Sequence, residues 1–181
     1  TAACRRLGVG VASPPFAHLH VASSHSLRYG ATLPELLVQR SAELGQSIVA
    51  LTDRDGLYAA VRWVRECSRL GIRPVLGVDI AVEATQAARV HPDVQARTPA
   101  RGGRWIDETR PRVLLLATGS RGWASLCRLV SAAHIGDHTA RGEPWVPWSA
   151  LREHSEGIVV ILGADSEVGR YLADERATLA E

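Results

Sequence analysis

Short apolar runs alternate with helical patterns along most of this chain, and this alternation restricts the folds open to it. Five strand-like runs share a compact apolar character, at Phe16–Val21, Ser47–Thr52, Arg73–Val82, Arg112–Thr118 and Gly157–Gly163. Runs of this kind are typical of strands buried on both faces of a sheet. Because strands and helices alternate with short connections, we expect an α/β fold with parallel strands joined by right-handed crossovers.

Apolar residues at helical spacing occupy the segments between these runs. We expect helices at Leu33–Leu44, Leu57–Leu70 and Trp123–Ala133, with a last helix from about Glu167. The first two end at Gly45 and Gly71, and glycine is a common residue just after a helix. The helices therefore support the same α/β prediction.

Two segments depart from the alternation. Thr1–Pro15 is rich in small residues and ends in two prolines, which predicts a flexible leader. Residues 83–110 are rich in Ala, Arg, Thr, Pro and Gly without a clear period, which predicts a surface insertion or a disordered loop. We expect residues 16–181 to form one domain. With five predicted strands and no Met even at position 1, we also expect a fragment of a longer protein.

Composition narrows the classes of function and the location. The formal net charge of +2 is too small to indicate a nucleic-acid partner by itself. The three cysteines are odd in number and widely spaced, so they indicate neither a disulfide framework nor a zinc ribbon. A reducing cytoplasm fits this pattern. No segment has the roughly 18 consecutive apolar residues of a membrane span, so no membrane partner is expected.

Polar side chains stand near the ends of the predicted strands, where ligands bind in parallel α/β folds. In chain order they are His18, His20, Asp53, Arg54, Asp55, Asp79 and Asp165. Imidazoles and carboxylates that converge at one end of a barrel are the ingredients of a hydrolytic metal centre. The sequence therefore raises the hypothesis of a metal site.

Simpler roles are open to the same residues. Two histidines on one face of a strand can merely hydrogen-bond backbone carbonyls. Asp53 precedes a glycine and a helix, where a turn-forming or capping carboxylate is the commoner role. His134 and His138 have i, i+4 spacing, but Gly136 between them predicts that the helix has ended. We therefore expect no second metal pair there.

Five motifs in a fixed order carry a family resemblance. They are HLHVASSHSLRYGAT, ALTDRDGLYAAVRW, GIRPVLGVDIAV, VLLLATGSRGWASLCRLVSAAH and HSEGIVVILG. Together they resemble the amino-terminal PHP (polymerase and histidinol phosphatase) domain of bacterial C-family DNA polymerases, the DNA polymerase III alpha subunits. The resemblance runs from about Phe16 to the end. The TDRDGLY form is most similar to the error-prone or accessory alpha subunits of high-GC Gram-positive bacteria.

The resemblance implies a PHP-type distorted (β/α)7 barrel, similar to a TIM barrel, that is incomplete in this chain. Active members of the family bind a cluster of metal ions, often zinc, at the strand ends and can support phosphoesterase or 3′-5′ exonuclease chemistry. His18, His20 and Asp79 match ligand positions, and Asp53 is a possible further ligand. We expect these residues to be the vestige of a site with low metal occupancy.

Four positions depart from the active pattern. Active members carry Asp at the position of Tyr29, His at Arg54, His at Arg112 and often Cys at Ala164. Arginine stays protonated in proteins, so two of these changes place fixed positive charge where cations should bind. At ~4 Å and an effective dielectric constant of about 20, one such charge costs a divalent cation roughly 8 kcal/mol. We expect a guanidinium paired with Asp53 or Asp79 to replace the metal structurally.

The resemblance implies part of a DNA-directed DNA polymerase, a nucleotidyltransferase that acts in DNA replication or error-prone repair synthesis. The carboxylates of nucleotidyl transfer lie in a downstream palm domain, so we expect no catalytic residue here, no cofactor, and a structural role against the palm and thumb. DNA, magnesium and replisome or translesion partners would be engaged by the full-length enzyme. The main alternative is an active phosphoesterase or 3′-5′ exonuclease that uses zinc or manganese. A stand-alone phosphatase is disfavoured by the polymerase-like motifs.

Overall fold

The structure is a computed structural model that describes residues 16–85, 98–99, 105–106, 110–137 and 143–178. The expected leader at Thr1–Pro15 lies outside the described residues, as does most of the expected loop at 83–110. Two short strands of that loop are described, β3 (Thr98–Pro99) and β4 (Trp105–Ile106), and they pair antiparallel with each other. None of the described helices is long and apolar enough to cross a membrane.

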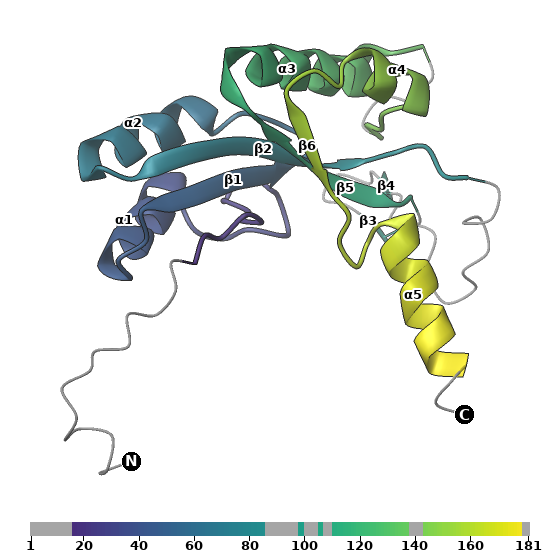
Figure 1. The fold of residues 1–181 in the computed structure, drawn as a ribbon, viewed down its shortest axis with the longest axis horizontal. Coiled ribbons are helices and arrows are strands. Elements are labelled where there is room, and N and C mark those ends of the chain that lie inside the picture. Colours follow the sequence, from purple (N-terminus) through teal and green to yellow (C-terminus); the bar gives the residue numbers. More distant parts are fainter. Residues whose placement is uncertain (1–15, 86–97, 100–104, 107–109, 138–142, 179–181) are drawn as a thin grey trace, which may run out of the picture.

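A four-stranded mixed sheet forms the centre of the described structure (Figure 1). In sheet order its strands are β1 (Ile48–Arg54), β2 (Arg73–Ala81), β5 (Arg112–Ala117) and β6 (Ile158–Ile161). The first two are parallel, whereas β5 is antiparallel to both of its neighbours. The α/β class is confirmed.

The expectation that all strands run parallel is wrong, and the connections explain why. Among the described elements, only β1 and β2 are joined by a single crossover helix, the arrangement that returns a chain to pair in parallel. Between β5 and β6 the chain forms two helices, α3 (Gly119–Ile135) and α4 (Trp148–Glu153). Helix α3 starts directly after β5 and α4 ends shortly before β6, and β6 starts beside the end of β5 (Figure 1).

The predicted helices are present, with shifted boundaries. The structure has α1 (Pro34–Glu43), α2 (Ala60–Leu70) and α5 (Glu167–Thr178) besides the two helices above. Helix α2 begins one turn later than expected, because Leu57 to Ala59 form a turn before it. Helix α3 begins one turn earlier than expected, directly after Thr118. Local apolar spacing therefore predicted where helices lie better than where they start.

The first apolar run is not a regular strand, contrary to expectation. His18 forms a single parallel bridge with Val49, and its carbonyl accepts a hydrogen bond from the Ala50 N–H at 2.9 Å. Further along, the Val21 N–H donates to the Thr52 hydroxyl at 2.9 Å instead of to a strand carbonyl. The run thus lies beside β1, but a side chain interrupts the ladder.

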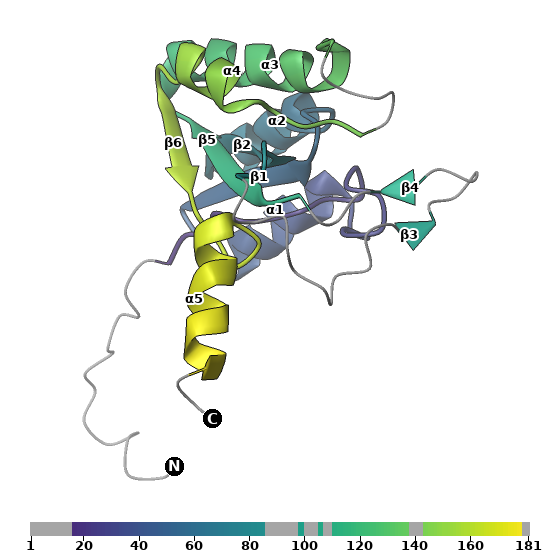
Figure 2. The same ribbon diagram turned by 90° about the vertical axis from the view of Figure 1, so that its right-hand side faces the viewer.

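Two hydrophobic clusters hold helices against the sheet. One joins β2 and β5 to α3 and α4 through residues that include Ile80, Leu115 and Leu129. The other joins β1 to α1 and α2 around Trp63, which is fully buried. Figures 1 and 2 show α3 and α4 along one side of the sheet, while α5 projects away on the opposite side.

Candidate functional site

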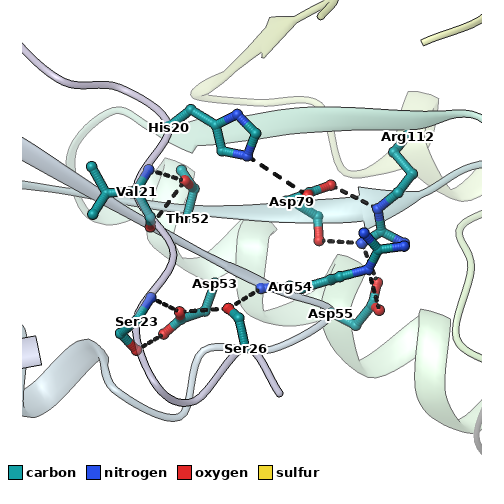
Figure 3. Close-up of polar contacts among 10 residues, drawn as sticks. All are labelled: His20, Val21, Ser23, Ser26, Thr52, Asp53, Arg54, Asp55, Asp79 and Arg112. Atoms are coloured by element: carbon teal, nitrogen blue, oxygen red, sulfur yellow. Dashed lines mark hydrogen bonds and ion pairs between the residues drawn. The ribbon is translucent and has the colours of Figure 1, made fainter. Parts of the chain in front are cut away.

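The ends of four strands meet at one end of the sheet. Because β6 runs in the same direction as β2 and β5 runs against both, the last residues of β1, β2 and β6 lie beside the first residues of β5. Arg54 pairs in register with Asp79, and Arg112 lies opposite Ala81, two residues further along. Since directly paired residues share a face of the sheet and alternate residues repeat it, the Arg54, Asp79 and Arg112 side chains project to one face (Figure 3).

Arg112 occupies the middle of this strand-end cluster, which we define as Arg54, Asp55, Asp79 and Arg112. Its Nε donates to Asp79 Oδ1 at 2.8 Å, and its Nη2 donates to Asp55 Oδ1 at 2.7 Å and to the Asp79 carbonyl at 2.8 Å. The residue is only 7% exposed. Burial acts to lower the pKa of Arg112, but the two carboxylates more than offset it, so the pKa lies above its ordinary value. The guanidinium is therefore a fixed, paired cation.

Hydrogen bonds to backbone carbonyls connect two further segments to the cluster. The Arg112 N–H donates to the Asp165 carbonyl at 2.9 Å, which places the segment after β6, including Ala164, beside the cluster. The Asp55 N–H donates to the Asp79 carbonyl at 2.9 Å, and His134 Nε2 donates to the Asp55 carbonyl at 2.6 Å. Asp55 has left-handed backbone, with φ of 56°, a conformation that Asp tolerates better than most residues.

Asp53 is hydrogen-bonded to a loop and not to the strand-end cluster. Its carboxylate accepts hydrogen bonds from the Ser23 N–H at 2.6 Å, the Ser23 hydroxyl at 2.8 Å and the Ser26 hydroxyl at 2.7 Å. The Ser26 oxygen in turn accepts from the Arg54 N–H at 2.8 Å. Asp53 is 1% exposed, and strand alternation points it to the face opposite Arg54. Its contacts are those of a carboxylate that closes the loop of residues 23–26, as in the turn-forming alternative.

Arg54 is held by an aromatic ring. Its guanidinium carbon lies 3.9 Å from the centre of the Tyr29 ring, which is a cation–π contact. The nearest carboxylate oxygen, Asp55 Oδ2, is 3.9 Å from Arg54 Nε. Burial, and then the charge of Arg112, lower the pKa of Arg54 from its ordinary value. Tyr29 and Arg54, both expected to depart from the ligand pattern of active family members, therefore contact each other.

The two histidines lie at the edge of the cluster and differ in their contacts. His20 Nε2 is 3.7 Å from Asp79 Oδ2, and the His20 side chain is 56% exposed (Figure 3). His18 is also exposed, and its ring meets the Phe16 ring edge-on with centroids 4.7 Å apart. The structure thus brings His20 and Asp79 together, while His18 contacts an aromatic side chain.

The residues at this site do not fit a cluster of divalent cations. Asp79 approaches His20 through Oδ2, and its Oδ1 accepts a hydrogen bond from Arg112. A divalent cation bound there would lie close to the Arg112 guanidinium, and the repulsion between the two charges would cost several kcal/mol. Across the part of the chain that the structure describes, no group of three or more His, Cys, Asp or Glu side chains is placed to hold a metal ion.

Sequence reasoning missed several residues of this site. The sequence predicts Asp53 or Asp79 as the partner of a guanidinium, whereas the structure pairs Arg112 with Asp55 and Asp79. Ser23 and Ser26 were not singled out, although a Ser-rich loop before a carboxylate is a signal for side-chain to backbone capping. His134 was weighed only as a metal ligand, whereas it binds a backbone carbonyl.

Residues 18–181 match the family described as the PHP domain. The chain is 37% identical over 152 residues to the error-prone DNA polymerase of Mycobacterium tuberculosis (strain ATCC 25618 / H37Rv), which covers 84% of this chain and 12% of that protein. It is 34% identical over 179 residues to the error-prone DNA polymerase of Anaeromyxobacter sp. (strain K), covering 93% and 14% respectively.

The chain therefore spans only 12–14% of the length of these relatives. Among solved structures, an amidohydrolase from Chromobacterium violaceum superposes with a TM-score of 0.45 at 19% sequence identity, over 66% of this chain and 34% of that one.

Proposed function

This chain belongs to the PHP domain family, and from that membership we propose that it is a structural, metal-free PHP domain of an error-prone DNA polymerase. The observation that carries the proposal is the buried Arg112 guanidinium, which bridges Asp55 and Asp79 at the strand ends. Its relatives are named as error-prone DNA polymerases, which are nucleotidyltransferases.

The physical basis is that an internal guanidinium can replace a metal as the counter-ion of buried carboxylates. Asp55 and Asp79 are 24% and 14% exposed, so both need a partner for their charge. Arginine supplies a permanent charge and a planar set of donors, whereas a metal site needs ligands with free electron pairs. We propose that His18, His20, Asp79 and Asp53 are the remnants of such a ligand set.

We further propose how this domain serves a parent polymerase. Residues 16–181 would form the domain body, with the palm and thumb packed against it, and the domain itself would supply no catalytic residue. DNA, magnesium and replisome or translesion partners would be engaged elsewhere in the parent enzyme, in the cytoplasm, during replication or error-prone repair synthesis. The small fraction of the relatives' length that this chain matches supports a role as one part of a larger protein.

Metal content tests the proposal directly. The 181-residue chain is produced with zinc and manganese supplied, dialysed, and analysed by inductively coupled plasma mass spectrometry. We expect far less than one metal ion per chain, because Arg112 already neutralises the carboxylates. Two or more tightly bound metal ions per chain would overturn the metal-free assignment.

The rival function is a manganese-dependent phosphoesterase or 3′-5′ exonuclease, and it rests on the approach of His20 to Asp79. A nuclease assay with manganese compares the wild type with His18→Ala and His20→Ala. Equal background rates in all three proteins would reject the rival. A rate in the wild type that both variants lose would establish it in place of the structural role.

A further inference from the structure

Helix α5 lies outside both hydrophobic clusters. Of its described residues none belongs to either cluster, and Val168, Tyr171 and Leu172 are 50%, 63% and 52% exposed. A pocket of about 320 Å³ lies between the helix and Thr85. Figures 1 and 2 show the helix projecting away from the sheet. Apolar burial therefore contributes little to holding α5 in place.

The first turn of α5 is joined firmly to the turn before it. The Ser166 hydroxyl accepts a hydrogen bond from the Gly169 N–H at 3.0 Å and donates to the Gly163 carbonyl at 2.6 Å, so Ser166 caps the helix. Ser166 is 1% exposed, and a Cβ placed on Gly169 would overlap the Gly163 carbonyl oxygen. Residues 163–178 therefore form one unit, which we call the α5 strap.

The α5 strap crosses the end of the β2–β5 strand pair. The Val82 N–H donates to the Pro111 carbonyl at 2.9 Å, so pairing of the two strands continues one residue past the end of β2. We define this strand-pair end as residues 82–85, which follow β2, and residues 110–112, which lead into β5. The strand-end cluster lies at the same place, because Arg112 is the first residue of β5.

Hydrogen bonds between three pairs of residues attach the α5 strap to the strand-pair end. The Thr85 N–H and hydroxyl donate to the Glu167 carboxylate, the hydroxyl at 3.1 Å, the Arg112 N–H donates to the Asp165 carbonyl at 2.9 Å, and Arg170 Nη2 donates to the Arg110 carbonyl at 3.1 Å. The attachment is therefore polar, and one of its bonds reaches the backbone of the residue at the centre of the strand-end cluster.

Polar attachments of this kind are weak. The contacts between Thr85 and Glu167 are exposed, and water competes for hydrogen bonds at exposed positions. Helix α3, by contrast, buries Leu126 and Leu129 completely in the core. Segments with few buried apolar contacts open at a lower free energy than the core does. We therefore expect α5 to open while α3 stays closed.

We propose that the α5 strap opens as a unit from the strand-pair end and that its opening releases the start of β5. Because the Arg112 guanidinium holds Asp55 and Asp79, the strap controls how firmly the strand-end cluster is closed. The inference goes beyond the structural role proposed above, because it assigns a moving part to the domain. It does not depend on the metal content of the protein.

Amide hydrogen exchange, followed residue by residue by NMR on the isotope-labelled 181-residue chain in EDTA, tests the strap. We expect α5 amides to exchange roughly tenfold or more faster than the slowest amides of α3. Glu167→Ala should speed exchange of the α5 amides and of the Arg112 N–H by roughly three- to tenfold and leave α3 unchanged. The Arg112 N–H is decisive, since it is not bonded to Glu167 itself.

Two outcomes would overturn the proposal. One is an α5 that is as protected from exchange as α3 in the wild type. The other is faster exchange in α5 alone, with the Arg112 N–H unchanged in Glu167→Ala, because that result indicates fraying of the helix and no link to β5. EDTA keeps metal out of the measurement, so failure of the metal-free assignment and failure of the strap are distinguishable.

Two further variants make the result specific. Glu156→Ala removes an exposed carboxylate that accepts from Arg121 at 2.7 Å outside the strap, and it should leave the exchange of α5 and of the Arg112 N–H as in the wild type. Arg170→Ala removes the bond to the Arg110 carbonyl and should speed the same amides as Glu167→Ala. It also replaces Glu167→Ala if that variant lacks a native spectrum. Wild-type exchange rates in a folded Arg170→Ala would likewise refute the strap.

Discussion

At the scale of single residues, Arg112 is the central polar residue of the strand-end cluster. One buried guanidinium donates to two carboxylates and a carbonyl that come from β2 and from the loop after β1. A buried ion pair stabilises little compared with an apolar replacement, yet removal of one partner is costly because the other charge stays behind. The contribution of Arg112 to stability is therefore measured best by replacing Arg112 alone, because the two carboxylates then lose their partner.

Arg112→Gln should lower the free energy of unfolding by about 3–5 kcal/mol, since Asp55 and Asp79 lose their counter-ion. Urea denaturation measures the change. Arg121→Gln is the matched control, because Arg121 also pairs with a carboxylate at 2.7 Å but is 81% exposed. Arg121→Gln should change the free energy of unfolding by no more than about 1 kcal/mol. Equal losses in the two variants would refute a special role for burial at Arg112.

Restoring the residues that active family members carry should restore metal binding. The triple variant Tyr29→Asp/Arg54→His/Arg112→His removes two fixed charges and adds three ligands beside His20 and Asp79. We expect zinc to bind to it and to raise its melting temperature. The double variant Arg54→Gln/Arg112→Gln removes the same charges without adding ligands and should bind no zinc. A triple variant that folds but binds no zinc would show that these three positions do not account for the absence of metal binding.

At the scale of elements, α3 and the turn before β6 are in backbone contact. The Gly157 carbonyl accepts from the Thr118 N–H and hydroxyl, both at 2.8 Å, at the start of α3. A Cβ placed on Gly122 would overlap that same carbonyl oxygen. The side-chain-free surface of Gly122 therefore sets how closely the helix approaches the strand.

Gly122→Ala should destabilise the protein by about 1–3 kcal/mol, because the methyl group meets backbone that cannot move aside easily. Gly163→Ala is the control: a Cβ there has no atom within 4 Å. Its effect should be small. Thermal unfolding followed by circular dichroism compares the two, and an equally stable Gly122→Ala variant would disprove the close approach.

Helices α1 and α2 are linked by a polar contact around Glu66. Its carboxylate accepts from Arg69 at 2.7 and 2.9 Å and from Gln39 at 3.0 Å. These hydrogen bonds, that from Arg69 first, lower the pKa of Glu66 from 4.5 to about 2. A carboxyl group with a lowered pKa stabilises the fold above its unfolded pKa, and that contribution is lost as the pH falls.

The difference in unfolding free energy between the wild type and Glu66→Gln should therefore be constant above about pH 5 and shrink as the pH falls from 4.5 toward 2. Urea denaturation at a series of pH values measures it. Glu43→Gln, which removes an exposed ion pair on α1, is the control and should change the free energy of unfolding by less than about 1 kcal/mol. A difference between wild type and Glu66→Gln that stays constant down to pH 2 would contradict the lowered pKa.

At the scale of the whole molecule, the described sheet ends in an apolar edge strand. In the strand order β6 is the last strand, and its Val159 and Val160 are 46% and 43% exposed. The following helix adds exposed apolar side chains at Val168, Tyr171 and Leu172. An edge strand with exposed valines and unpaired backbone groups is a template for pairing with another chain.

The chain should therefore self-associate at high concentration, and Val160→Lys should reduce that association, because a charged residue on an edge strand blocks pairing. Sedimentation equilibrium over a range of concentrations measures the mean mass. Val61→Lys, on an exposed position of α2, is the control and should associate like the wild type. Association that is equal in all three proteins would exclude β6 as the contact.

Much of the fold was predictable because its signals are local. The apolar runs that became β1, β2, β5 and β6 and the spacing that became α1, α2, α3 and α5 depend on neighbouring residues alone. Strand direction was not predictable in this way. It depends on how many helices connect one strand to the next: α2 alone lies between β1 and β2, whereas both α3 and α4 lie between β5 and β6.

By itself, the sequence determined most element types and the family, and it raised the hypothesis that metal ligands are replaced at Tyr29, Arg54 and Arg112, since each of these depends on residue identity and short-range order. Only the tertiary structure decided what those residues do instead. Arg112 meets Asp79 and Asp55 across 33 and 57 residues of chain, and Arg54 meets Tyr29 from a separate loop. Pairing at such separations follows from strand register and direction, because an antiparallel β5 brings its first residue to the end where β2 finishes.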